Sequence, residues 1–205
     1  MARTSTWSIM GAMSGTGIAI IVLAALVLAV GAWLVATYNR LVQRRNRIDN
    51  AWAQIDVQLK RRRDLVPNLV ETVKGYAAHE SATFEAVTRA RAAAASASTP
   101  EQAAAAEGQL GQALSRLFAV AEAYPELKAD AGFRDLQAEL ADTENRITVS
   151  RQVYNDTVLT YQNSIQSFPA VLVAGVMGFT SREYFELADE AERSVPGVRF
   201  DSPPS

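Results

Sequence analysis

The sequence predicts an all-α protein, in which an N-terminal transmembrane helix continues into a long antiparallel helical bundle with coiled-coil-like heptad seams. Three observations lead to this prediction. Residues 18–38 form an uncharged apolar run, apolar side chains beyond it recur at intervals of three, four and seven, and alanine is abundant while glycine and proline gather at a few places. Alanine favours helices over strands, and recurrence at seven is typical of helices packed side by side.

The apolar run 18–38, IAIIVLAALVLAVGAWLVATY, holds no charge over 21 residues and follows a short N-terminal tail, residues 1–17. At 1.5 Å per residue it covers about 31 Å, the thickness of a bilayer core. A buried helix of a soluble protein and a cleaved signal peptide are the alternatives. The apolar core of a signal peptide is about 7–15 residues long and follows a charged region, so a transmembrane helix fits this run better.

Positive charge gathers after the span. Arg40, Arg44, Arg45 and Arg47 follow it within ten residues, whereas only Arg3 precedes it. Because cytoplasmic flanks carry the excess of arginine and lysine, we predict a single-pass protein of the inner (cytoplasmic) membrane, with the N-terminus outside and the C-terminal domain in the cytoplasm.

A heptad seam continues straight out of the span, so the span and the first bundle helix are predicted to form one rod. Pro67 either kinks this continuous helix or lies in the first turn of a new helix capped by Asp64, and the unbroken phase of the seam favours the kink. The seam skips one position at Arg62 and consists of Leu34, Tyr38, Leu41, Arg45, Ile48, Trp52, Ile55, Leu59, Val66, Leu69, Val73 and Tyr76.

Two shorter helices are expected next. The second covers residues 79–95, with Phe84, Val87 and Arg91 on one side, and Gly75 is expected to soften the join before it without ending the first helix. A turn at 98–100 then starts the third helix, with Thr99 as its N-cap and Pro100 at its first position. Pro125 lies near the end of the third helix and residues 128–133 form the next connection; the helix carries Leu110, Leu114, Leu117, Ala121 and Tyr124.

The fourth helix has the most regular pattern and completes a bundle over residues 39–167. Large apolar residues recur every seven positions, and a second row of small hydroxyl residues allows a neighbouring helix to approach closely. The helix is expected to end near Phe168, because the residue before a proline avoids the α conformation. The large row is Phe133, Leu140, Ile147, Tyr154, Tyr161 and Phe168, and the small row is Thr143, Ser150, Thr157 and Ser164.

Residues 168–187 form a separate hydrophobic C-terminal segment, and residues 188–205 a flexible tail. The stretch FPAVLVAGVMGF at 168–179 is uncharged but too short to span a bilayer. It either fills the end of the bundle or lies at the surface against the membrane or a second protomer. Because the seams of the first and fourth helices already fill a core, we predict the surface role and an oligomer in the membrane.

Residue types for catalysis or ligand binding do not assemble into a motif. The chain has no cysteine, its one histidine, His79, lacks the second histidine of a zinc-protease motif, and its helical glycines are isolated. We therefore predict no enzyme, no metal and no cofactor. With a net charge of −2 and no regular interleaving of aromatic residues with the cations, nucleic acid is not an expected partner.

Contacts with lipid or protein are the remaining role. Arg45 and Arg62 fall within the seam, so each is expected to meet a carboxylate of another helix or to lie at an open interface. The candidate interface residues are Arg44, Arg45, Arg61, Arg62, Phe168, Leu172, Met177 and Phe179.

Three stretches resemble the LemA family of bacterial membrane proteins: YNRLVQRRNRIDNAWAQIDVQLKRRRDLVPNLVETVKGYAAHE at 38–80, VYNDTVLTYQNSIQSFP at 153–169 and GFTSREYFE at 178–186. The resemblance implies a membrane helix with a cytoplasmic helical bundle, no established enzymatic activity, and a place in the cell envelope beside membrane proteases and stress proteins. This sequence differs from the family pattern in its wholly apolar FPAVLVAG, because family members commonly have a polar residue within a few positions after FP. We expect a self-assembling membrane-anchored scaffold or adaptor; the alternative is a regulatory partner of an envelope membrane protease.

Overall fold

The computed structural model describes residues 15–186, so most of the predicted N-terminal tail and the predicted flexible tail lie outside the described residues. The described part is all-α and contains no strand, which confirms the predicted fold class. Its helices are α1 (Gly15–Lys74), α2 (Ser81–Ser96), α3 (Pro100–Glu122), α4 (Pro125–Ala129), α5 (Ala131–Gln166) and α6 (Val171–Ala174).

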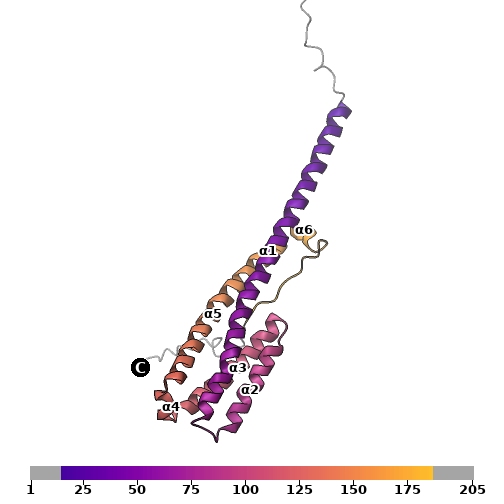
Figure 1. Ribbon diagram of the computed structural model, residues 1–205. Coiled ribbons are helices and arrows are strands. Elements are labelled where there is room, and N and C mark those ends of the chain that lie inside the picture. The colour runs from indigo at the N-terminus through magenta and orange to yellow at the C-terminus, as the bar shows by residue number, and fades with distance from the viewer. Residues whose placement is uncertain (1–14, 187–205) are drawn as a thin grey trace, which may run out of the picture.

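Helix α1 is a single rod of 60 residues, as the seam predicted. Its first half stands free of the other helices, and its second half runs through the bundle (Figure 1). Every residue from 18 to 33 is exposed, whereas Leu41, Ile48, Ile55 and Leu59 are almost fully buried. An isolated apolar helix of this length is stable only where its side chains leave water, so the free half is a candidate membrane span.

Pro67 lies inside α1, so the helix does not restart at Asp64. A proline has no N–H and leaves the carbonyl four residues earlier without its helical donor. That carbonyl belongs to Arg63, and it accepts a hydrogen bond of 2.8 Å from Nε of Arg91 on α2. The proline therefore creates an acceptor that attaches α2 to α1.

Helix α5 packs antiparallel along the bundle half of α1. Arg44 is paired with Thr160 near one end, and Arg61 with Glu139 farther along, so residue numbers rise on one helix as they fall on the other. Helices α2 and α3 form a hairpin that packs mainly on itself and on the part of α1 remote from the span (Figure 1).

The interior has two apolar cores. One surrounds Val66, Leu69 and Val73 at the end remote from the span, and the other surrounds Leu41, Ile55 and Leu59 near the span. Arg62 lies between these two groups on α1, at the position where the apolar seam skips a residue. The skipped position therefore marks a boundary between two cores.

The helix ends follow local side-chain chemistry. Thr99 caps α3 as predicted, accepting a hydrogen bond of 3.2 Å from the Gln102 N–H, with Pro100 at the first helical position. Asp130 caps α5 in the same way, through a bond of 2.8 Å from the Phe133 N–H. Helix α5 ends at Gln166, close to the predicted end at Phe168.

Three details of the prediction are wrong. Gly75 does not merely soften the first helix: α1 ends at Lys74, and Tyr76 consequently leaves the seam and is 40% exposed. Tyr124 follows α3 instead of lying on it, because Pro125 starts the short helix α4 ahead of the expected connection at 128–133. The seven-residue row of buried side chains does not extend to Phe168, because this residue lies beyond the end of α5 and is 80% exposed.

Candidate membrane-facing site at the head of the bundle

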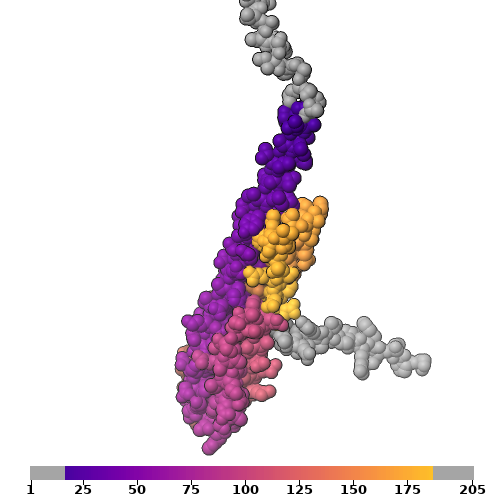
Figure 2. All heavy atoms as spheres, turned by 90° about the vertical axis from the view of Figure 1, so that its right-hand side faces the viewer, coloured from indigo at the N-terminus to yellow at the C-terminus, as the bar shows by residue number. Residues whose placement is uncertain are grey.

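Residues 168–186, which we call the head segment, follow α5 at the end of the bundle next to the free half of α1. They form α6 and then run back without regular secondary structure (Figure 1). In the space-filling view the head segment lies against α1, between the free half of α1 and the α2–α3 hairpin (Figure 2). The head segment thus covers the place where the candidate span becomes the bundle.

Side chains of α5 hold the returning part of the head segment by its backbone. The Tyr161 hydroxyl donates to the Thr180 carbonyl at 2.9 Å, and the Tyr154 hydroxyl donates to the Glu183 carbonyl at 2.8 Å. Burial raises the pKa of both phenols, which favours the protonated, hydrogen-bond-donating form. Tyrosine suits this position because its ring fills the core while its hydroxyl reaches a carbonyl at the edge.

Asn155 completes the attachment. Its Oδ1 accepts a bond of 2.9 Å from the Phe185 N–H, and its Nδ2 donates to the Phe185 carbonyl at 3.2 Å. The Phe185 ring is fully buried and lies 5.7 Å from the ring of Trp52 on α1. Sequence reasoning assigned Asn155 no role in a site, because its partners are backbone atoms that no sequence pattern marks.

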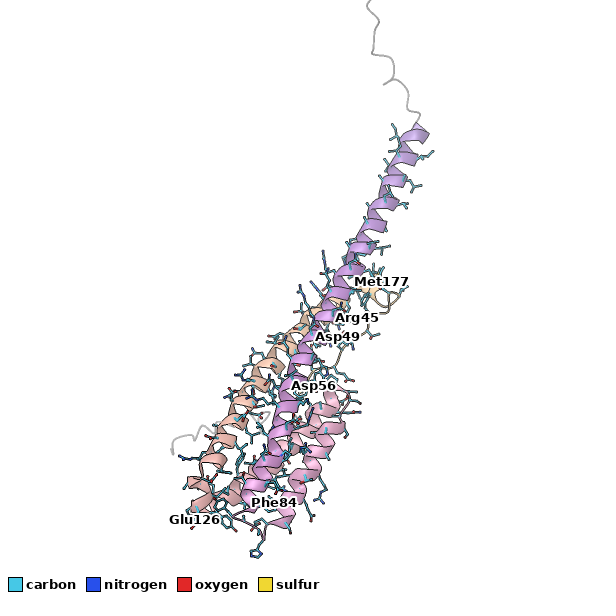
Figure 3. The ribbon with its side chains drawn as sticks, in the orientation of Figure 1. Arg45, Asp49, Asp56, Phe84, Glu126 and Met177 are labelled. Atoms are coloured by element: carbon cyan, nitrogen blue, oxygen red, sulfur yellow. The ribbon has the colours of Figure 1, made fainter. Side chains whose placement is uncertain are left out.

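Phe179 joins the head segment to the start of the bundle half of α1. Its buried ring lies 5.6 Å from that of Tyr38, the last residue of the apolar run, and the Arg45 guanidinium lies over it at 5.6 Å. Arg182 then pairs with Asp49 at 3.5 Å. In Figure 3, Met177 of the head segment lies beside α1, Arg45 and Asp49 follow farther along α1, and Phe84 and Glu126 lie at the far end of the bundle.

Four apolar side chains of the head segment point into solvent, and we call them the apolar lobe: Phe168, Val171, Leu172 and Val176. Their exposed fractions are 80%, 48%, 67% and 92%. Phe168 borders the same hollow as Trp33 and Thr37, which belong to the apolar run of α1. If that run is in the bilayer, the lobe is level with the bilayer surface.

This hollow, which we call the head hollow, has a volume of about 370 Å³ and lies between α1 and the end of α5. Arg40 and Arg44 come from α1, and Arg44 Nη1 also donates to the Thr160 carbonyl at 3.4 Å. The remaining lining residues are Trp33, Thr37, Leu41, Thr160, Asn163, Ser164, Ser167, Phe168, Pro169 and Ala170.

A second polar feature lies in mid-bundle. Arg62, which is 8% exposed, contacts Glu107 at 3.3 Å and Glu144 at 3.2 Å, and Arg63 contacts Glu107 at 3.5 Å. Burial raises the pKa of Glu107, although both guanidiniums oppose the change. A groove of about 520 Å³ between α3 and α5 connects this cluster with solvent.

The predicted interface residues fall into two groups. Six of them lie at the head and two, Arg61 and Arg62, lie in mid-bundle; the six are Arg44, Arg45, Phe168, Leu172, Met177 and Phe179. Arg62 meets carboxylates of other helices, as expected for a cation in the seam, and Arg61 pairs with Glu139 at the surface. Whether these residues contact a partner stays a prediction. Among the described residues no cluster of metal-ligating side chains occurs, and His79 is exposed.

A bare apolar helix continuing into a helical bundle defines a membrane-associated helical protein. The chain belongs to the LemA family, because the sequence model of that family matches residues 51–200. It is similar to the magnetosome proteins MamQ 1 and MamQ 2 of Paramagnetospirillum magneticum, with 36% identity over 81 residues, or 40% of this chain and 30% of each relative. The magnetosome protein MamQ of Magnetospirillum gryphiswaldense is 35% identical over 80 residues, which are 39% of this chain and 29% of that protein. The match therefore spans less than a third of these relatives.

Proposed function

We propose that the protein is a membrane-anchored scaffold or adaptor of the bacterial cell envelope, which holds its bundle against the cytoplasmic face of the inner membrane and self-assembles there. The observation that carries the proposal is the continuity of α1. The free half of α1 and the bundle half, which lines both cores, belong to one continuous helix, so the position of the bundle is fixed relative to the membrane.

The head segment supports this arrangement. Phe179 packs on Tyr38, and the tyrosines of α5 hold the rest of the segment by its backbone. The apolar lobe is consequently fixed beside the end of the span. Its exposed side chains suit either the membrane interface or a second copy of the chain, and both fit a protein that organises others at a membrane.

The cations beyond the span support the orientation. Arg40, Arg44, Arg45 and Arg47 follow the apolar run, and the positive-inside bias places such a flank in the cytoplasm. A reporter enzyme fused after Ser205 is expected to be active only when it is a type that functions in the cytoplasm. Activity of a periplasm-specific reporter at this position would contradict the orientation.

Purification of the full chain in mild detergent tests the role itself. We expect the protein to be recovered with other copies of itself or with non-enzymatic envelope proteins. A stoichiometric membrane protease in the same preparation would favour a regulatory partner of that protease over a general scaffold.

A further inference from the structure

The head hollow has two unlike walls. Trp33 and Phe168 form an aromatic wall on the side of the span, and the cations Arg40 and Arg44 lie on the side of the bundle. The two arginines are four residues apart on α1 and so project from one helix face. Among the described residues, those that line the hollow include no aspartate or glutamate. The positive charge of Arg40 and Arg44 is therefore not neutralised by a carboxylate in the lining.

The depth of these residues matches the layers of a bilayer. Arg40 and Arg44 lie about 3 Å and about 9 Å beyond Tyr38 along the helix axis, at 1.5 Å per residue. The polar layer on each side of the hydrocarbon core is about 5–8 Å thick. Arg40 therefore lies within the layer of the lipid phosphates, and the long Arg44 side chain, which tilts toward the helix N-terminus, reaches back to it. Trp33 lies about 8 Å inside the end of the apolar run.

We propose that the head hollow is a binding site for the headgroup of an anionic phospholipid. Arg40 and Arg44 bind the phosphate through charge-assisted hydrogen bonds, and the amide of Asn163, which also lines the hollow, contacts the polar headgroup. The acyl chains pass the Trp33 and Phe168 rings and continue along the bare half of α1. A free anion would use the arginines and leave the aromatic wall unused, so the lipid fits the whole hollow better.

The lipid would connect α1 and α5 at the head, because the hollow is built from both helices and from Phe168–Ala170. This inference rests on the proposed membrane anchoring, and the two can fail separately. Loss of the lipid site leaves the span intact, so the variant protein stays in the membrane fraction. Recovery of the wild-type chain in the soluble fraction would contradict the anchoring itself.

The test is native mass spectrometry of the full-length protein released from detergent, with dioleoyl phosphatidylglycerol or dioleoyl phosphatidylcholine added. We expect the wild type to bind phosphatidylglycerol roughly tenfold better, since each arginine near an anionic surface contributes favourably. The double variant Arg40→Gln/Arg44→Gln is expected to lose this preference. The control Arg89→Gln/Arg116→Gln removes two exposed cations from α2 and α3 and is expected to keep it.

Three results would overturn the proposal. The first is equal binding of the two lipids by the wild type. The second is an equal loss of preference in the control pair, which would indicate attraction by net charge. The third is a phosphatidylglycerol preference that survives the Arg40/Arg44 substitutions while binding of inorganic phosphate is lost, which would assign a free-anion site. The variant Trp33→Ala separates the sources further, because it is expected to weaken phosphatidylglycerol binding and not phosphate binding.

Discussion

Replacing Arg62 with methionine is expected to destabilise the bundle by about 3 kcal/mol, near the lower end of the cost of breaking a buried ion pair. Glu107 is 1% exposed and would keep only the contact with Arg63 at 3.5 Å. That remaining contact limits the loss. The freed partner Glu144 has a side chain that is 44% exposed and can be hydrated, so it adds little.

Thermal melting of the full-length protein in detergent, followed by circular dichroism, measures this loss. About 3 kcal/mol corresponds to a Tm lower by roughly 6–12 °C for a domain of this size. The control Arg61→Met removes an ion pair whose two side chains are 45% and 41% exposed, and it is expected to change the Tm little.

The double variant Arg62→Met/Glu107→Leu separates the two causes. Apolar side chains of similar volume replace a buried ion pair at little cost, so most of the lost stability should return. Equal Tm values for the single and double variants would contradict this explanation, because the loss would then come from packing and not from a stranded carboxylate.

The pH dependence of the free energy of unfolding gives a second test of the Arg62–Glu107 ion pair. Burial raises the pKa of Glu107 above its ordinary value of 4.5, so the folded bundle holds this proton more tightly than the unfolded chain does. Its contribution to the free energy of unfolding is complete below that value and falls as the pH rises through the folded pKa. Arg62→Met removes an attraction that opposes the shift, so its cost should be smaller at mildly acidic pH than at neutral pH.

Three further variants test other parts of the structure. Arg91→Ala is expected to lower the free energy of unfolding by about 1–3 kcal/mol, because it leaves the Arg63 carbonyl without a donor. The loss should be smaller in the Pro67→Ala background, where α1 stays helical and the N–H of residue 67 can bond to that carbonyl. Equal losses in the two backgrounds would show that the proline does not create this acceptor. Phe185→Ala is expected to lower the free energy of unfolding by about 3–5 kcal/mol, since the ring is fully buried. The head segment should then be cleaved by a protease before the bundle is. Cleavage unchanged from the wild type would contradict the role of Phe185 in holding this segment. Leu172→Asp/Met177→Asp, in a chain lacking residues 1–38, is expected to leave the bundle folded and to make it more soluble and more monomeric; loss of the fold would show that these side chains belong to the core.

Much of the fold could be predicted because it rests on apolar repetition. The seam from Leu41 to Val73 defines one helix, and the interruption at Arg62 coincides with the boundary between the two cores. The heptad row of α5 likewise gives the buried face from Phe133 to Tyr161. Periodicity succeeds here because both helices bury one continuous stripe over their length in the bundle.

The features that were missed depend on backbone groups. Gly75 ends α1 although the apolar pattern continues to Tyr76, because helix termination depends on local backbone conformation. The Asn155 contacts to Phe185 join residues 30 positions apart, and the acceptor and donor are main-chain atoms that every residue has. No sequence pattern marks such a pairing, so the head segment could be expected at the surface but not traced back along α5.

If α1 anchors the bundle at the membrane as proposed, the apolar lobe lies at the level of the bilayer surface. Because the chain has no cysteine, a single fluorophore can be attached to Leu172→Cys, with Ala119→Cys on the exposed face of α3 as the control. In liposomes, the label at 172 is expected to be quenched by spin-labelled lipid and shielded from iodide in the water, and the label at 119 to show the reverse. Equal quenching of both labels by iodide, with none by the lipid, would contradict the account.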